Sequence, residues 1–149
     1  MEHKPLIELE AIAEVKIAEG APAMGRDERL ERWISVLEGN SVRQLRSLFE
    51  FEYLPPDKRR ACRADNSPLT VAFEDPVLRR EGLKSDSLGD VLDFFDITEH
   101  HLHYAFCSCH VGSSFSAHQA GQRLRSLLRR ENSRSSRILE RIGRFFAAR

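Results

Sequence analysis

The residues best suited to chemistry lie between Thr98 and His110, a stretch that holds four of the six histidines and two of the three cysteines. Imidazole nitrogen and thiolate sulfur are ligands that zinc and similar transition metals prefer. If the stretch is one helix, with about 100° between successive residues, four of these side chains share one stripe. They are His100, His103, Cys107 and His110. Because one helix face seldom encloses a tetrahedral ion, we expect a further ligand from elsewhere, either His118 or Cys62.

An apolar stripe on the same helix, about 100° away, supports a simpler interpretation in which the protein has no cofactor. This stripe consists of Leu102, Ala105, Phe106 and Cys109. It would face the core, with Cys109 as a small buried hydrophobe, while the histidines form a solvated edge. The sequence leaves both interpretations open: a site for zinc or another transition metal, or a packed helix.

Redox and covalent chemistry are less well supported. Cys107-Ser-Cys109-His110 is one residue shorter than the haem-attachment motif Cys-x-x-Cys-His and the redox motif Cys-x-x-Cys. On a helix, the two thiols would point about 200° apart, so a disulfide would require the helix to unwind. The sequence also has no glycine-rich nucleophile elbow, phosphate loop or His-Glu-x-x-His motif. We therefore favour a function that is not enzymatic.

Length and composition set limits on the architecture. The 149 residues, 41% of them hydrophobic and 31% charged, suffice for one globular domain with an adequate core. No apolar run approaches the roughly 20 residues of a membrane span, and the first residues do not have the layout of a signal peptide. Three cysteines, an odd number, fit free or metal-bound thiols better than a disulfide framework. We expect a cytoplasmic protein.

The formal net charge of zero conceals an asymmetry along the chain. Residues 1–110 carry 21 acidic and 14 basic residues, whereas residues 111–149 carry two acidic residues and nine arginines. An acidic body with an arginine-rich tail indicates either self-association or a tail that binds an anionic partner. Alternatively, the tail folds back onto the acidic stretch 86–99 of its own chain.

Periodicity and capping signals predict an all-α single domain, irregular and built of many short helices. Residues 6–17 alternate like a strand, although their Glu and Ala content favours helix, and we expect a weak strand or a frayed arm. A polar break is expected at 131–136. The predicted organisation is an N-terminal arm and linker (1–25), a helical domain (26–130) and a protruding, basic amphipathic helix (131–149). The predicted helices are 27–39, 41–54, 56–63, 69–73, 77–80, one that is capped by Ser85 or Ser87 and reaches residue 95, 98–110, 116–130 and 137–149.

The C-terminal helix is the stronger functional lead, because arginines flank its apolar stripe. Such a helix suits a partner groove, self-association or an anionic membrane surface. Nucleic acid is disfavoured, because no aromatic residues alternate with the arginines and the acidic body repels phosphate. We predict a cytosolic regulatory or adaptor protein that acts through protein–protein contacts, with a metal- or thiol-based sensor as the alternative. The predicted partner-binding residues are Arg137, Arg141, Ile142, Phe145 and Phe146.

Overall fold

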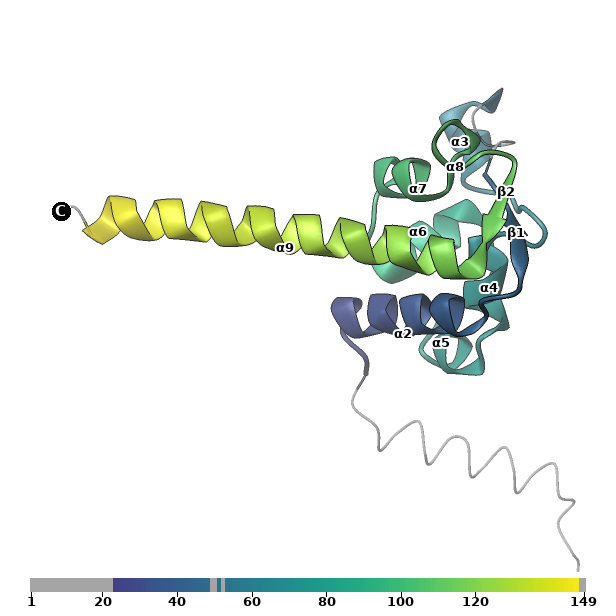
Figure 1. Cartoon of the computed structure of the whole chain (residues 1–149), viewed down its shortest axis with the longest axis horizontal. Coiled ribbons are helices and arrows are strands. Elements are labelled where there is room, and N and C mark those ends of the chain that lie inside the picture. The colour runs from purple at the N-terminus through teal and green to yellow at the C-terminus, as the bar shows by residue number, and fades with distance from the viewer. Residues whose placement is uncertain (1–22, 49–50, 52, 148–149) are drawn as a thin grey trace, which may run out of the picture.

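The computed structural model describes residues 23–48, 51 and 53–147 and confirms a mostly helical fold, to which it adds one short two-stranded sheet (Figure 1). The ambiguous stretch 6–17 lies outside the described residues. The helices are α2 (Arg26–Gly39), α3 (Pro56–Arg59), α4 (Pro68–Glu74), α5 (Pro76–Arg80), α6 (Leu88–Phe95), α7 (Glu99–Phe106), α8 (Ser108–Val111) and α9 (Ala117–Ala147), and the strands are β1 (Gln44–Arg46) and β2 (Ser114–Ser116).

Four of the helices begin at capping residues that the sequence predicts. The side-chain oxygens of Ser67, Asp75, Ser87 and Thr98 each accept a hydrogen bond from the backbone N–H three residues further on. These bonds satisfy N–H groups that have no partner inside the helix. Proline follows two of the caps, at the first helical position, where its missing N–H costs nothing.

The core is centred on Trp33 of α2. Its ring stacks on Phe95 of α6 at a centroid distance of 4.5 Å and meets the edge of Phe106 of α7 at 5.7 Å. The indole Nε1 donates to the backbone oxygen of Pro68, 3.0 Å away, so its one polar group is satisfied although the residue is fully buried. One side chain thus ties α2, α4, α6 and α7 together.

The prediction of a helix over 41–54 is wrong. Residues 44–46 form β1, which pairs antiparallel with β2 and places Leu45 opposite Phe115. Both of these side chains are buried, while their neighbours on the strands point outward. The apolar spacing of Leu45 and Leu48 fits a helix equally well, and the pairing partner lies about 70 residues away in sequence. The strand is therefore a product of long-range contacts.

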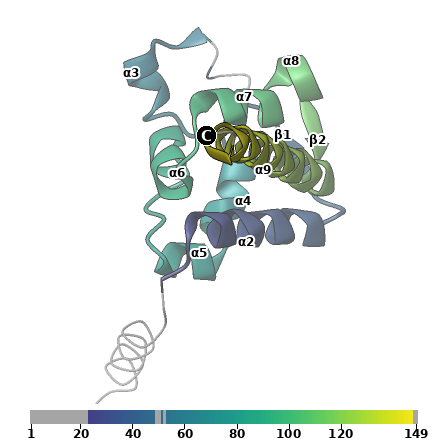
Figure 2. The same ribbon diagram turned by 90° about the vertical axis from the view of Figure 1, so that its left-hand side faces the viewer.

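Helix α9 is unbroken from Ala117 to Ala147, which contradicts the predicted break at 131–136. Its first turns run antiparallel to α2 and also contact α7, while its later turns project from the body (Figures 1 and 2). The prediction of a protruding C-terminal helix is therefore confirmed, because the described residues 132–147 project from the body instead of folding back onto 86–99. None of the helices in the described residues is long and apolar enough to cross a membrane.

Candidate functional site

The His/Cys stretch is divided by a turn at Cys107, so the predicted single helix over 98–110 is wrong. Cys107 has an extended backbone (φ −73°, ψ 146°) between the end of α7 and the start of α8. The change of direction makes the predicted burial of Cys109 wrong. Cys107 is buried, with 1% of its surface exposed, whereas Cys109, predicted to be a core residue, is exposed.

The turn is held by distant parts of the chain that bind the last carbonyl groups of α7. The backbone N–H of Leu48 donates to the oxygen of Phe106 at 2.9 Å. From α9, Arg123 donates through Nε to the oxygen of Ala105 (2.9 Å) and through Nη2 to that of Tyr104 (2.6 Å). Because these partners satisfy carbonyls that a longer helix would use internally, α7 ends at this point.

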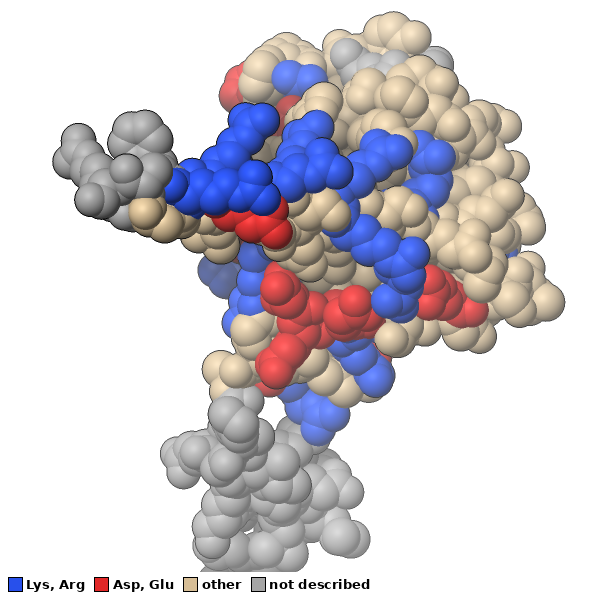
Figure 3. Space-filling view, turned by 60° about the vertical axis from the view of Figure 1, so that its left-hand side comes forward, with Lys and Arg blue, Asp and Glu red and all other residues tan. Residues whose placement is uncertain are grey.

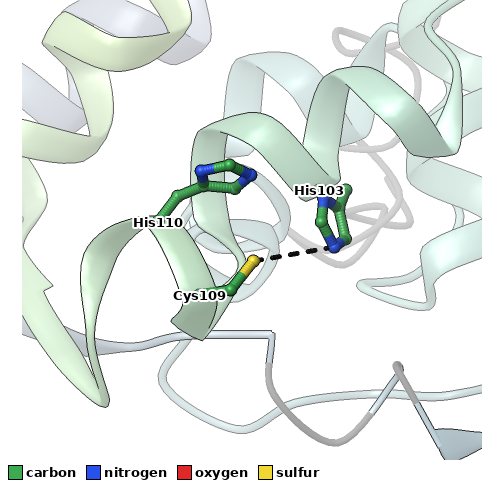
Figure 4. Close-up of side chains that lie close together, drawn as sticks. All are labelled: His103, Cys109 and His110. Carbon is green, nitrogen blue, oxygen red and sulfur yellow. Dashed lines mark hydrogen bonds between the residues drawn. The ribbon is translucent and has the colours of Figure 1, made fainter.

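Four side chains around the turn form what we call the His/Cys cluster: His103, Cys107, Cys109 and His110. Ligand atoms of His103, Cys109 and His110 all lie within 4.8 Å of one another (Figure 4). The Sγ atom of Cys109 lies 3.8 Å from Nε2 of His103 and 3.3 Å from Sγ of Cys107. The prediction that the two thiols point far apart is therefore wrong, because it assumed an uninterrupted helix.

Tyr104 connects the cluster to α9. Its ring centroid lies 5.3 Å from that of His110. The guanidinium groups of Arg123 and Arg130 lie over the same tyrosine ring, at 5.1 and 5.2 Å from its centroid. Cations in this position are attracted to the ring face. The side of the cluster at His110 therefore rests on a ring that α9 fixes in place.

The other predicted metal ligands have different neighbours. Exposed His118, on the first turn of α9, has its Nδ1 3.5 Å from the backbone oxygen of Glu38. Cys62 is half-buried between α3 and α4, and its carbonyl accepts a hydrogen bond from Leu88. His100 is exposed on the first turn of α7 and does not belong to the group of converging ligand atoms. The structure thus brings together His103 and His110 with the unpredicted Cys109.

The second candidate surface is the projecting part of α9, residues 132–147, here called the α9 extension. Its described apolar side chains are exposed: Ile138 by 57%, Leu139 by 69% and Ile142 by 47%. The extension carries four arginines and one acidic residue, and basic side chains cover much of the projecting end (Figure 3). The predicted Arg137 and Arg141 are among them and are exposed, whereas the side chains of Phe145 and Phe146 lie outside the described part.

The apolar stripe of the extension repeats that of the α9 base, as we call residues 117–130. Eighteen residues span about five turns of an α-helix, so two residues this far apart lie at the same angular position. In the base, Ala120 and Leu124 are buried, and Leu127 and Leu128 pack against the core. Eighteen positions later stand Ile138, Ile142, Phe145 and Phe146. The face that packs against the body therefore continues beyond it.

Ion pairs fix the base and the start of the extension. Arg125 pairs through both terminal nitrogens with α2, at 3.1 Å from Glu31 and 3.0 Å from Glu38. The hydrogen bonds from Arg125 hold the pKa of Glu38 below its usual value, although partial burial acts in the opposite direction. Where the helix leaves the body, Glu131 contacts Arg26 of α2 (3.1 Å) and His101 of α7 (2.9 Å).

No protein family, curated protein or solved structure matches this chain. The His/Cys cluster and the α9 extension are therefore the basis for a functional proposal.

Residues that sequence reasoning missed are those whose role depends on long-range partners. Arg123 and Glu131 resemble ordinary charges on a helix surface, yet one ends α7 and the other anchors the start of the extension. No local pattern distinguishes them from their neighbours. Cys109 could have been found only by recognising the turn at Cys107, and its causes are the distant Leu48 and Arg123.

Proposed function

We propose that the protein is a non-catalytic adaptor that binds another protein through the α9 extension. The observation that carries the proposal is the continuation of the packed face of α9 for several turns beyond the body, with exposed Ile138, Leu139 and Ile142. Isolated exposed apolar residues are common, but an apolar stripe along a projecting helix is typical of helix-in-groove recognition.

The chemistry of the partner follows from the way the base is covered. Helix α2 packs against the base, where the backbone of Ile34 lies close to Gly121, and the acidic residues Glu31 and Glu38 of α2 pair with Arg125. The extension presents the same combination of an apolar stripe and arginines. The best-matched occupant is therefore an acidic amphipathic helix of another protein, similar in character to α2.

Two other occupants fit less well. A second copy of the extension would bring four more arginines to the interface, and charges of the same sign repel one another. An anionic membrane surface would accept a basic amphipathic helix, but binding of that kind needs no defined partner groove. Both are outcomes that the experiment must distinguish.

The test uses full-length protein and two synthetic helical peptides with the same leucine stripe, one flanked by glutamates and the other by lysines. The substitution pair Leu139→Asp/Ile142→Asp places charges on the stripe. The pair Ser133→Asp/Ser136→Asp is the matched control, because it adds the same two charges outside the stripe on the same exposed helix. Binding is measured by fluorescence anisotropy, with light scattering and sedimentation with phosphatidylglycerol vesicles in parallel.

We expect the glutamate peptide to bind and the lysine peptide not to bind. Each large apolar side chain buried contributes about 1.5–3 kcal/mol, so the stripe substitutions should weaken binding by tenfold or more. The serine substitutions should have a smaller effect, limited to the added charge. Failure to bind the glutamate peptide would overturn the proposal. The proposal would also be overturned if Leu139 and Ile142 were needed for vesicle binding or self-association and not for peptide binding.

A further inference from the structure

The turn between α7 and α8 brings two imidazoles and two thiols to one place at the surface. Cys107 approaches from the buried side, while His103, Cys109 and His110 are exposed. The four residues come from an eight-residue stretch that would spread them over more than one face if it were a continuous helix. The observed convergence is a consequence of the tertiary fold.

The spacing of the donor atoms resembles that around a tetrahedral ion. With metal–nitrogen distances of about 2.0–2.1 Å and metal–sulfur distances of about 2.3 Å, neighbouring ligand atoms lie roughly 3.3–3.8 Å apart. The two sulfur atoms lie 3.3 Å apart, and Sγ of Cys109 lies 3.8 Å from Nε2 of His103. The ligand atoms of His103, Cys109 and His110 lie within 4.8 Å of one another, so these side chains must draw closer by about 1 Å to bind one ion. Cys107 joins this group through its contact with Cys109.

We propose that His103, Cys107, Cys109 and His110 bind one transition-metal ion of borderline or soft character, with Zn²⁺ as the ion to test. A set of two thiolates and two imidazoles favours such ions over Mg²⁺ or Ca²⁺, which prefer oxygen ligands. Binding replaces the proton of each thiol, so affinity should fall as the pH is lowered. This site is separate from the α9 extension, and its failure would leave the proposed protein binding unaffected.

The surroundings keep the site in position before an ion arrives. Arg123 holds the end of α7 through two backbone carbonyls, and Tyr104 supports the ring of His110. Contacts that orient the ligating side chains from outside raise the affinity of metal sites. An ion that links α7 to α8 would also fix the short helix α8, so binding should reduce the local mobility of residues 107–111.

The test is a titration of full-length, untagged, reduced protein with Co²⁺, which reports the number and type of its ligands by absorption. We expect one Co²⁺ per chain, a visible spectrum typical of tetrahedral coordination, a near-ultraviolet thiolate band, and displacement by Zn²⁺. His103→Ala and Cys109→Ser should each weaken binding by about tenfold or more, and Cys109→Ser should also halve the thiolate band. Both side chains are exposed, so the variants should fold, which circular dichroism checks.

The matched controls are His118→Ala and Cys62→Ser, which remove the same two residue types elsewhere in the fold. They should leave the affinity and the spectrum unchanged. Lack of binding by the reduced wild-type protein, an octahedral spectrum without a thiolate band, or an equal loss in the control variants would overturn the assignment.

Discussion

The two halves of α9 have the same helical face but different surroundings. In the base, Ala120 and Leu124 are covered by the body, and Arg125 has two acidic partners on α2. In the extension, Ile138 and Ile142 occupy the same angular positions five turns later, and both are exposed. The spacing of apolar residues therefore determines which side of α9 can pack. Whether that side is covered within the chain depends on the rest of the body, which offers an apolar and acidic surface to the base but not to the extension.

The largest expected difference between the two halves is in the effect of removing an apolar side chain. Leu124→Ala leaves a cavity at a buried position and should lower the free energy of unfolding by about 2–5 kcal/mol. Ile142→Ala, at the equivalent exposed position, should change it by less than about 0.5 kcal/mol. Urea denaturation followed by tryptophan fluorescence measures both, because Trp33 lies in the core.

Equal losses in the two variants would contradict the comparison, because they would mean that Ile142 is covered in solution. Sedimentation of the wild-type protein at several concentrations then distinguishes cover by a second copy from cover within one chain.

The same contrast explains how much of the fold could be predicted. Caps such as Ser67 and Asp75 act on N–H groups three residues away, so a short stretch of sequence contains the whole interaction. The apolar stripe of the extension is local in the same sense. The strand at Leu45 and the turn at Cys107 depend on partners far away in sequence, and both were predicted as helix. Local signals are sufficient for the first group and insufficient for the second.

The candidate site divides in the same way. His103 and His110 could be selected because they are chemically suited to metal binding and lie close in sequence. The choice of Cys107 as a ligand and Cys109 as a core residue relied on a continuous helix, and the carbonyl partners Leu48 and Arg123 interrupt it. The continuity of α9 was missed for a different reason. Serine and asparagine weakly disfavour a helix, but the turns on either side and the anchored Glu131 outweigh them.

An intermediate effect is expected from adding one methyl group to a glycine in each half of α9. At Gly121, a Cβ atom would lie 2.6 Å from Cγ of Glu38 and 3.1 Å from the backbone oxygen of Ile34. Gly121→Ala should therefore push α2 and α9 apart, and the overpacking should lower the free energy of unfolding by about 1–3 kcal/mol. The higher helix propensity of alanine offsets roughly 1 kcal/mol of this loss. At Gly143 nothing lies within 4 Å, so Gly143→Ala should only strengthen the helix.

Two measurements distinguish the effects of the two substitutions. Chemical denaturation should show a lower midpoint for Gly121→Ala and an unchanged midpoint for Gly143→Ala. Far-ultraviolet circular dichroism should show equal or greater helicity for Gly143→Ala. A lower midpoint for Gly143→Ala would indicate that a close neighbour covers the extension at this point, and would contradict its description as exposed.

The smallest effect concerns the ion pair that distinguishes the covered half. Arg125 holds the pKa of Glu38 below its usual value, so the folded protein retains the carboxylate at a pH where the unfolded chain begins to bind a proton. The stabilisation is fully present above the unfolded value, about 4.3, and is lost as the pH falls through the lower folded value. For a partly exposed pair, the coupling energy should be about 0.2–1 kcal/mol.

A double-mutant cycle with Glu38→Gln and Arg125→Gln measures this coupling by denaturation at pH 7 and again at the lowest pH at which the protein remains folded. Coupling should be present at pH 7 and smaller at the lower pH, because Glu38 binds a proton as the pH falls through its lowered pKa and then no longer attracts the guanidinium group. Arg137→Gln, in the exposed extension, is the control and should have little effect on stability at either pH. Coupling of equal size at both pH values would mean that packing rather than charge joins Arg125 to α2. The pairing of Arg125 with α2 would then no longer support the inference that the partner of the extension is acidic.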